Sequence, residues 1–209
     1  PQREHAVPFR RCSFLPLYPF WRTPSNARRR PRIMVAVRGK GSEMQRKVTG
    51  AQNVSRMCLV CGTENAAGLH ARFFELEGGE LVGVFRPSAE HQGYPGRLHG
   101  GIASAILDET IGRAINSGEA DVWGVTVELA VRYRRPVPLD EELRVVGRIT
   151  KDSSRLFEGS GEILLPDGAI AVEARGKYLK MPIERIAEGD FDTDDWAADS
   201  RPAPDEIDV

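Results

Sequence analysis

The sequence predicts an α+β fold in which one helix packs against a largely antiparallel sheet. Only one segment, residues 101–116, has the pattern of a long helix, whereas six segments have the pattern of strands. The predicted order is β-β-α-β-β-β-β, and the short turns between most strands favour antiparallel pairing. The helix is apolar around most of its circumference, as expected of a helix that a sheet surrounds.

The strands are predicted from the alternation of apolar and polar residues between turn signals. The clearest case is residues 125–133, where alternating side chains run until Pro136-Val137-Pro138 breaks the pattern. Gly78-Gly79 and Pro166-Asp167-Gly168 mark turns between neighbouring strands. The remaining strands are predicted at residues 70–77, 80–86, 142–151, 155–165 and 169–181.

The composition divides the chain into three parts. Residues 1–50 carry twelve Lys and Arg against Glu4 and Glu43, with no sustained periodicity, and we expect a disordered Arg/Pro-rich leader. An organelle-targeting peptide and an interaction arm are the alternatives for this part. Residues 57–183 hold the predicted domain. Residues 184–209 carry ten Asp and Glu against two Arg, which indicates an acidic, flexible tail.

Composition narrows the classes of function. The formal net charge of -1 gives no general attraction to nucleic acid or membranes, and 41% hydrophobic residues suffice for an ordinary core. The sequence contains no apolar run near the roughly 20 residues that a membrane helix needs. Three cysteines, an odd number, do not indicate a disulfide framework, so we expect a protein of the reducing cytoplasm.

The polar residues of the predicted helix stand out because its other residues are apolar. Glu109 and Arg113 form an i,i+4 pair that can neutralise itself. Asp108 lies about 100° away around the helix, where no cation of the same helix reaches it. Such a carboxylate is either solvated through a cleft or costly to keep charged, which makes Asp108 a candidate catalytic group. The alternative is an exposed Asp at a helix edge.

The start of the helix is a second candidate feature. His99-Gly100-Gly101 provides a backbone with little side chain where unpaired N–H groups and the positive end of the helix dipole converge. This arrangement suits an oxygen that gains negative charge during a reaction. A tight turn is the alternative.

These motifs together resemble a known family. His99-Gly100-Gly101 with Asp108 nine residues after the His is similar to the hot-dog thioesterases of the phenylacetyl-CoA type. The segment 90–102, Leu107-Asp108-Glu109 and the opening 58–62 with Asn65 and Gly68-Leu69 resemble members of the same superfamily. The likeness covers essentially all of residues 57–183.

The resemblance implies the hot-dog fold, a curved antiparallel sheet wrapped around one long helix. It also implies a homodimer, or a tetramer of dimers, that hydrolyses acyl-CoA to a free acid and CoA at the subunit interface without a metal or redox cofactor. The Gly100 N–H would polarise the thioester carbonyl, and Asp108 of the opposite subunit would act as general base or nucleophile. His99 would shape the site.

One position departs from the family pattern. Relatives often carry an Asn or Gln about six residues before the His to hold water, and that place is Gly93 here, so Gln92 or His91 is the candidate for the role. The other candidate substrate-binding residues are Gly101, Thr126, Glu128 and Arg132. Arg132 belongs to a cluster with Arg134 and Arg135 that suits the CoA phosphates, or else forms a solvated strand end.

Other motifs carry less weight. Cys58-x-x-Cys61 is typical of zinc or redox sites, but no second Cys pair follows, so we expect a structural turn and no metal ligands. Ser104 lacks the Gly-x-Ser-x-Gly context of a serine hydrolase. The sequence therefore favours an acyl-CoA thioesterase, with a non-catalytic acyl-CoA-binding hot-dog module as the alternative. A hot-dog dehydratase or hydratase would need a different Asp and His spacing.

Overall fold

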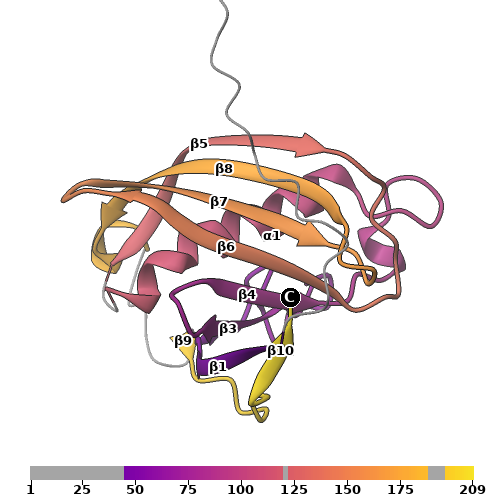
Figure 1. Ribbon diagram of the computed structural model, residues 1–209, viewed down its shortest axis with the longest axis horizontal. Coiled ribbons are helices and arrows are strands. Elements are labelled where there is room, and N and C mark those ends of the chain that lie inside the picture. Colours follow the sequence, from indigo (N-terminus) through magenta and orange to yellow (C-terminus); the bar gives the residue numbers. More distant parts are fainter. Residues whose placement is uncertain (1–44, 120–121, 188–195) are drawn as a thin grey trace, which may run out of the picture. The chain divides into compact units, whose positions relative to one another are not determined.

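The computed structural model describes residues 45–119, 122–187 and 196–209, and it confirms the predicted α+β class and hot-dog fold. A curved sheet wraps around α1 (Gly100–Arg113), with β6, β7 and β8 crossing in front of the helix in Figure 1. The order across the sheet is β10-β1-β3-β4-β6-β7-β8-β5, and every pairing is antiparallel. The strands are β1 (Gln45–Ala51), β3 (Arg72–Leu76), β4 (Leu81–Phe85), β5 (Trp123–Tyr133), β6 (Leu143–Asp152), β7 (Leu156–Leu164), β8 (Ile170–Met181) and β10 (Glu206–Asp208).

Several small elements complete the fold. The strands β2 (Val54–Ser55) and β9 (Trp196–Ala197) pair as a separate two-stranded sheet. Short 3-10 helices are η1 (Ala89–His91) before α1, η2 (Ala114–Ser117) directly after it, and η3 (Ile183–Arg185) after β8. The predicted turn Gly78-Gly79 joins β3 to β4 with positive φ angles of 99° and 84°, a conformation that glycine adopts without strain.

The sheet extends beyond the predicted domain range of 57–183 at both ends. Strand β1 begins at Gln45, in the segment expected to be disordered, and pairs with β3 and β10. Strand β10 lies in the expected acidic tail, where Ile207 is buried. Both strands are mostly polar, so backbone pairing with neighbouring strands places them rather than an apolar pattern of their own. Residues 1–44 and 188–195 of the predicted leader and tail lie outside the described residues.

The helix and the sheet approach each other closely. Ile106, Leu107 and Ile111 of α1 are fully buried. A Cβ added to Gly159 of β7 would lie 2.4 Å from Cγ2 of Ile111, and one added to Gly147 of β6 would lie 2.9 Å from the Thr110 carbonyl oxygen. Glycine at these two positions lets the strand backbone lie directly against α1. This close packing fixes the rotation of the helix and therefore the direction in which its polar residues point.

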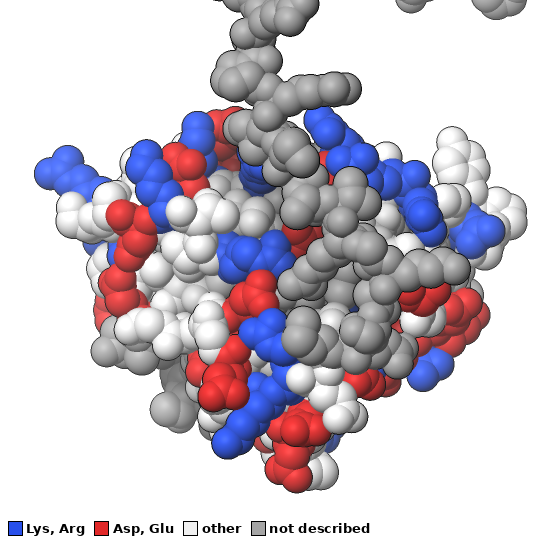
Figure 2. Space-filling model, in the orientation of Figure 1, with Lys and Arg blue, Asp and Glu red and all other residues white. Residues whose placement is uncertain are grey.

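The outer face of the sheet is polar and of mixed charge. Figure 2 shows acidic and basic side chains interspersed over the face that Figure 1 presents. Arg46, Glu80, Arg148 and Glu162 form a chain of ion pairs across β1, β4, β6 and β7, with N–O distances of 2.6 to 2.9 Å. Within the described residues, α1 and the other helices are too short or too polar to cross a bilayer.

Candidate active site

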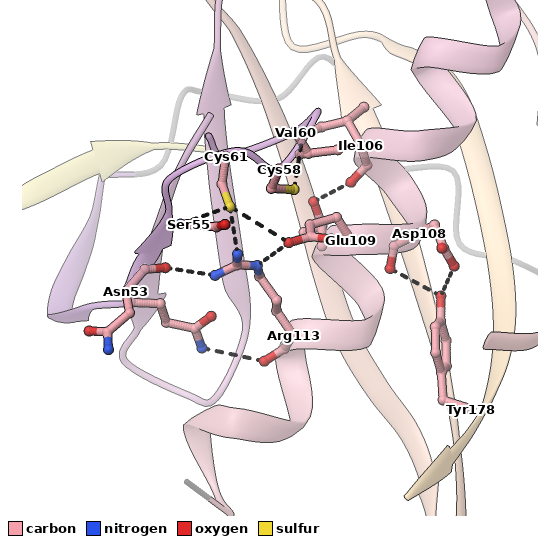
Figure 3. A network of polar contacts seen from close by, with 12 residues as sticks. Asn53, Ser55, Cys58, Val60, Cys61, Ile106, Asp108, Glu109, Arg113 and Tyr178 are labelled. Carbon is pink, nitrogen blue, oxygen red and sulfur yellow. Dashed lines mark hydrogen bonds and ion pairs between the residues drawn. The ribbon is translucent and has the colours of Figure 1, made fainter. Parts of the chain in front are cut away.

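Asp108 lies on the side of α1 that faces β5 and β8. The Thr126 hydroxyl of β5 donates to both carboxylate oxygens at 2.9 and 3.0 Å. The Tyr178 hydroxyl of β8 donates to Oδ1 at 3.0 Å, and Figure 3 shows the ring approaching the carboxylate from the sheet. Among the described residues, no Lys or Arg forms an ion pair with Asp108.

Burial controls the titration of this carboxylate. It raises the pKa of Asp108 above the usual value, the hydrogen bonds from Thr126 and Tyr178 lower it, and the charge of Glu109 raises it again, with a net upward shift. Burial and the nearby charge of Asp108 also raise the pKa of Tyr178, so its hydroxyl stays protonated and donates. Asp108 is therefore a carboxylate that two neutral hydroxyls hold, and its destabilised charge favours accepting a proton.

The N-terminus of α1 presents one open backbone donor. His99 is the N-cap residue, and its Nδ1 accepts from the Gly101 N–H at 3.0 Å, so the proton of its ring is on Nε2. Gly100 is the first helical residue, whose N–H has no partner within the helix. Ser104 and Tyr133 donate to the Gly100 carbonyl oxygen at 3.1 and 2.7 Å and lie 2.7 Å from each other.

The loop before the helix is pinned by a buried histidine. His91 accepts the Ser88 N–H on Nδ1 at 2.9 Å, and its Nε2 donates to the Ala67 carbonyl oxygen at 3.1 Å. Both ring nitrogens are therefore engaged inside the protein, and the ring is 5% exposed. The His91 carbonyl oxygen accepts from the His99 N–H at 2.8 Å, which couples this loop to the helix cap.

The two residues that follow His91 differ in exposure and contacts. Gln92 is exposed, and its Oε1 accepts from the Gly96 N–H at 2.7 Å. A Cβ on Gly93 would lie 3.0 Å from the His99 Cα, so the loop packs against the cap where the family pattern has a larger residue.

The predicted substrate-binding residues lie in different settings. Gly101 is exposed at the helix start, and Thr126 is bonded to Asp108. Glu128 of β5 pairs with Lys177 of β8 at 2.9 Å. Arg132 is highly exposed and lies 3.6 Å from the Glu173 carboxylate.

The arginine cluster at the end of β5 is partly neutralised. Arg134 donates to both oxygens of Glu173 at 2.8 and 2.7 Å, and Arg135 lies 3.9 Å from the Asp167 carboxylate. Because Glu173 is shared, Arg132 makes only a long contact and its guanidinium stays accessible. Phosphate binding by this cluster would therefore involve Arg132 before Arg134.

Sequence reasoning missed the hydroxyl groups of this region. Tyr178 occupies an inward-facing position of an alternating strand, where a buried hydroxyl requires a partner, and that requirement was the available signal. Ser104 and Tyr133 are 29 positions apart, and only the fold brings them together at the helix start.

Comparisons with known proteins find similar thioesterases. Residues 95–172, which contain α1 and both parts of the site, match the thioesterase superfamily. An acyl-coenzyme A thioesterase of mouse, THEM4, is 28% identical over 56% of this chain, and an uncharacterized protein of Schizosaccharomyces pombe is 31% identical over 52%. The alignments span only 50% and 64% of those relatives' own lengths.

A solved structure gives the same assignment. A thioesterase superfamily protein superimposes with a TM-score of 0.56 and 32% sequence identity, covering 60% of this chain and 61% of the other. The fold and the sequence match therefore define a hot-dog protein. Residues 95–172 are therefore similar to the thioesterase superfamily.

Proposed function

We propose that this protein hydrolyses acyl-CoA thioesters to a free acid and CoA. The observation that carries the proposal is Asp108, a half-buried carboxylate that accepts hydrogen bonds from Thr126 and Tyr178 and has a raised pKa. A carboxylate in this state is suited to take a proton from attacking water as general base. The same group is also placed to attack the thioester carbon as nucleophile.

The helix N-terminus supplies the electrophilic half of the reaction. Attack on a thioester places negative charge on its carbonyl oxygen, and the Gly100 N–H at the positive end of the α1 dipole is suited to donate a hydrogen bond to that oxygen. The His99 ring already accepts the hydrogen bond of the neighbouring Gly101 N–H. The Gly101 N–H therefore does not compete with the Gly100 N–H for the thioester oxygen. No metal or redox cofactor is required for this chemistry.

The two halves of the site need two copies of the chain. Gly100 and Asp108 are eight residues apart on one helix, which separates them by about 12 Å along its axis. One thioester group cannot contact both within a single chain. We therefore propose a homodimer, alone or doubled into a tetramer, in which Gly100 of one subunit faces Asp108 of the other.

The exposed edge of β5 supports this assembly. Within the described residues β5 pairs on one side only, with β8, and Val127 on it is 64% exposed. Unpaired strand edges readily add a strand from another chain. Pairing of two β5 edges would also bring Thr126, and with it Asp108, to the subunit interface.

The substrate would extend from the carboxylate toward the surface. Gly101 and Gln92 are exposed beside the helix start and suit the acyl or pantetheine end, with Gln92 as the candidate water-holding residue. Glu128 and Arg132 lie farther along β5, where the Arg132 guanidinium suits a CoA phosphate. His91 acts on the site through the loop that it anchors, because both its nitrogens are engaged.

A backbone donor can be removed here without disturbing the helix. Proline is favoured at the first helical position, and His99 already has the extended backbone, φ -64° and ψ 134°, that a following proline requires. Gly100→Pro should therefore delete the N–H while keeping the helix, whereas Gly100→Ala keeps the N–H and controls for the added Cβ, which would lie 3.4 Å from the Tyr133 hydroxyl.

The test is release of free thiol from a panel of aromatic, medium-chain and branched acyl-CoAs. We expect hydrolysis of at least one substrate, a loss of about 10²- to 10³-fold in kcat for Gly100→Pro, and little change for Gly100→Ala. Binding without turnover across the panel would replace the enzyme with an acyl-CoA-binding module. Undiminished turnover by Gly100→Pro would remove the helix N-terminus from the mechanism.

A further inference from the structure

A second polar cluster lies about 100° around α1 from Asp108. The Sγ atoms of Cys58 and Cys61 and a carboxylate oxygen of Glu109 all lie within 4.8 Å of one another. Figure 3 shows Glu109 and Arg113 directed toward Cys61, whereas Asp108 is directed away toward Tyr178. We propose that Cys58, Cys61 and Glu109 bind a thiolate-preferring divalent metal ion, with zinc as the expected ion and a solvent molecule as fourth ligand.

The spacing of the donor atoms fits a small tetrahedral ion. Zinc bonds of about 2.3 Å to sulfur and about 2.1 Å to oxygen place neighbouring donors about 3.5 to 3.8 Å apart. The Cys61 Sγ and the Glu109 Oε1 are 4.0 Å apart, and all three donor atoms lie within 4.8 Å of one another, so metal binding requires these side chains to move closer together.

The cysteine turn is built to bring its two sulfurs to the same side. The Gly62 N–H donates to the Cys58 carbonyl oxygen at 2.9 Å and closes the turn. A Cβ on Gly62 would lie 2.3 Å from that oxygen, so the turn requires glycine. Glu109 reaches the turn from α1, 48 positions away, which is why the sequence alone indicated only a two-cysteine motif.

Several N–H groups are directed at the sulfurs. The Val60 N–H donates to Cys58 at 3.3 Å, the Ser55 N–H donates to Cys61 at 3.4 Å, and the Arg113 Nη2 donates to Cys61 at 3.0 Å. Donors of this kind stabilise thiolates and form the outer shell of metal-bound cysteines.

The positive charge of Arg113 keeps the net charge of this cluster at zero both with and without a divalent ion. Arg113 is 5% exposed, and its guanidinium packs over the Phe73 and Trp196 rings. The same group donates to the Glu109 carboxylate at 2.7 Å and to the Asn53 carbonyl oxygen at 2.8 Å. With both thiols protonated, Arg113 neutralises Glu109. With a divalent ion bound, two thiolates and one carboxylate balance the ion and Arg113. The buried cluster is therefore neutral in both states, which avoids an uncompensated buried charge.

The test uses the full chain, reduced and stripped of metal with a chelator, and titrated with Co²⁺. We expect one cobalt per chain, a sulfur-to-cobalt charge-transfer band, and displacement of the band by Zn²⁺. Cys58→Ser and Cys61→Ser should each lower metal affinity by more than about 100-fold, because even changes outside the ligand shell cost 10- to 100-fold. Glu109→Gln should weaken binding but keep the thiolate band. Glu142→Gln, which changes an exposed carboxylate paired with Arg144, is the control and should bind as the wild type does.

The outcomes separate this proposal from the alternatives. Titration of the wild type requires no substitution, so a failure of Cys61→Ser to fold leaves the result interpretable. A wild type that binds no cobalt, or whose binding survives Cys58→Ser, overturns the metal site. An isolated Cys58–Cys61 disulfide in place of metal binding overturns it as well. Metal content is measured independently of hydrolysis, so this proposal and the proposed function can fail separately.

Discussion

Asp108 accepts hydrogen bonds from hydroxyl groups and forms no ion pair with a cation of the described residues, and these partners affect the pKa of its carboxylate. A cation would lower the pKa of the carboxylate and weaken it as a base. Thr126 and Tyr178 orient both oxygens without adding charge, while burial keeps the pKa raised. The site therefore combines a fixed geometry with a reactive carboxylate.

Removing the Thr126 hydroxyl should move the pH dependence of hydrolysis. Its hydrogen bond favours the charged carboxylate, so Thr126→Val raises the pKa of Asp108 further. Because the charged form is the base, the acid limb of the kcat/KM profile should shift to higher pH. Thr150→Val, which removes an exposed strand threonine bonded only to the Glu158 carbonyl oxygen, should leave the limb in place. An unmoved limb in Thr126→Val, or one shifted to lower pH, would contradict this account.

The sequence indicated Asp108, His99 and Gly100 because their patterns are local. Asp108 follows from the polarity of one helix, and the Gly-Gly start follows from helix-end chemistry. Tyr178 and Thr126 could not be assigned to Asp108 because their roles depend on which strands flank the helix, and strand order is a property of the whole sheet.

At the scale of elements, α1 organises the molecule by presenting a different group on each side. Its N-terminus offers the Gly100 N–H, one side offers Asp108, and the other offers Glu109 and Arg113. The long strands were predictable because alternation is strong in them. Strands β1 and β10 were not, because they are mostly polar and placed by pairing.

The close approach of β7 to α1 should make Gly159 sensitive to substitution. In Gly159→Ala the added Cβ would lie 2.4 Å from the Ile111 side chain and 3.0 Å from the Arg148 carbonyl oxygen. We expect the free energy of unfolding to fall by about 1–3 kcal/mol, measured by urea denaturation. Gly118→Ala, where the nearest atom is 3.9 Å away, is the control and should change little. Equal stabilities of the two variants would show that the sheet is not seated on the helix as described.

At the scale of the whole molecule, the proposed mechanism requires two subunits, because Gly100 and Asp108 lie about 12 Å apart along one helix. Two inactive variants should then complement each other. A mixed dimer of Asp108→Asn and Gly100→Pro contains one site with both groups intact and one site with neither. After equal mixing and subunit exchange we expect about a quarter of the wild-type activity, because about half of the dimers are mixed and each has one working site. No recovery, with exchange verified by differently tagged subunits, would place both groups in one chain.

The most direct test of the central claim is acyl-CoA hydrolysis by Asp108→Asn, followed as release of free thiol. Asn preserves shape and removes the base, so we expect kcat to fall by at least about 10²-fold. Binding of a non-hydrolysable acyl-CoA analogue should be largely retained. Folding is checked by the Tm at neutral pH, which should not fall. Because the pKa of Asp108 is raised in the folded protein, ionisation of this carboxyl destabilises the fold as the pH rises through that pKa. Asn carries no charge and avoids this loss of stability. Loss of turnover with binding and Tm intact would support Asp108 as the reactive carboxylate, and turnover at the wild-type rate would contradict the mechanism.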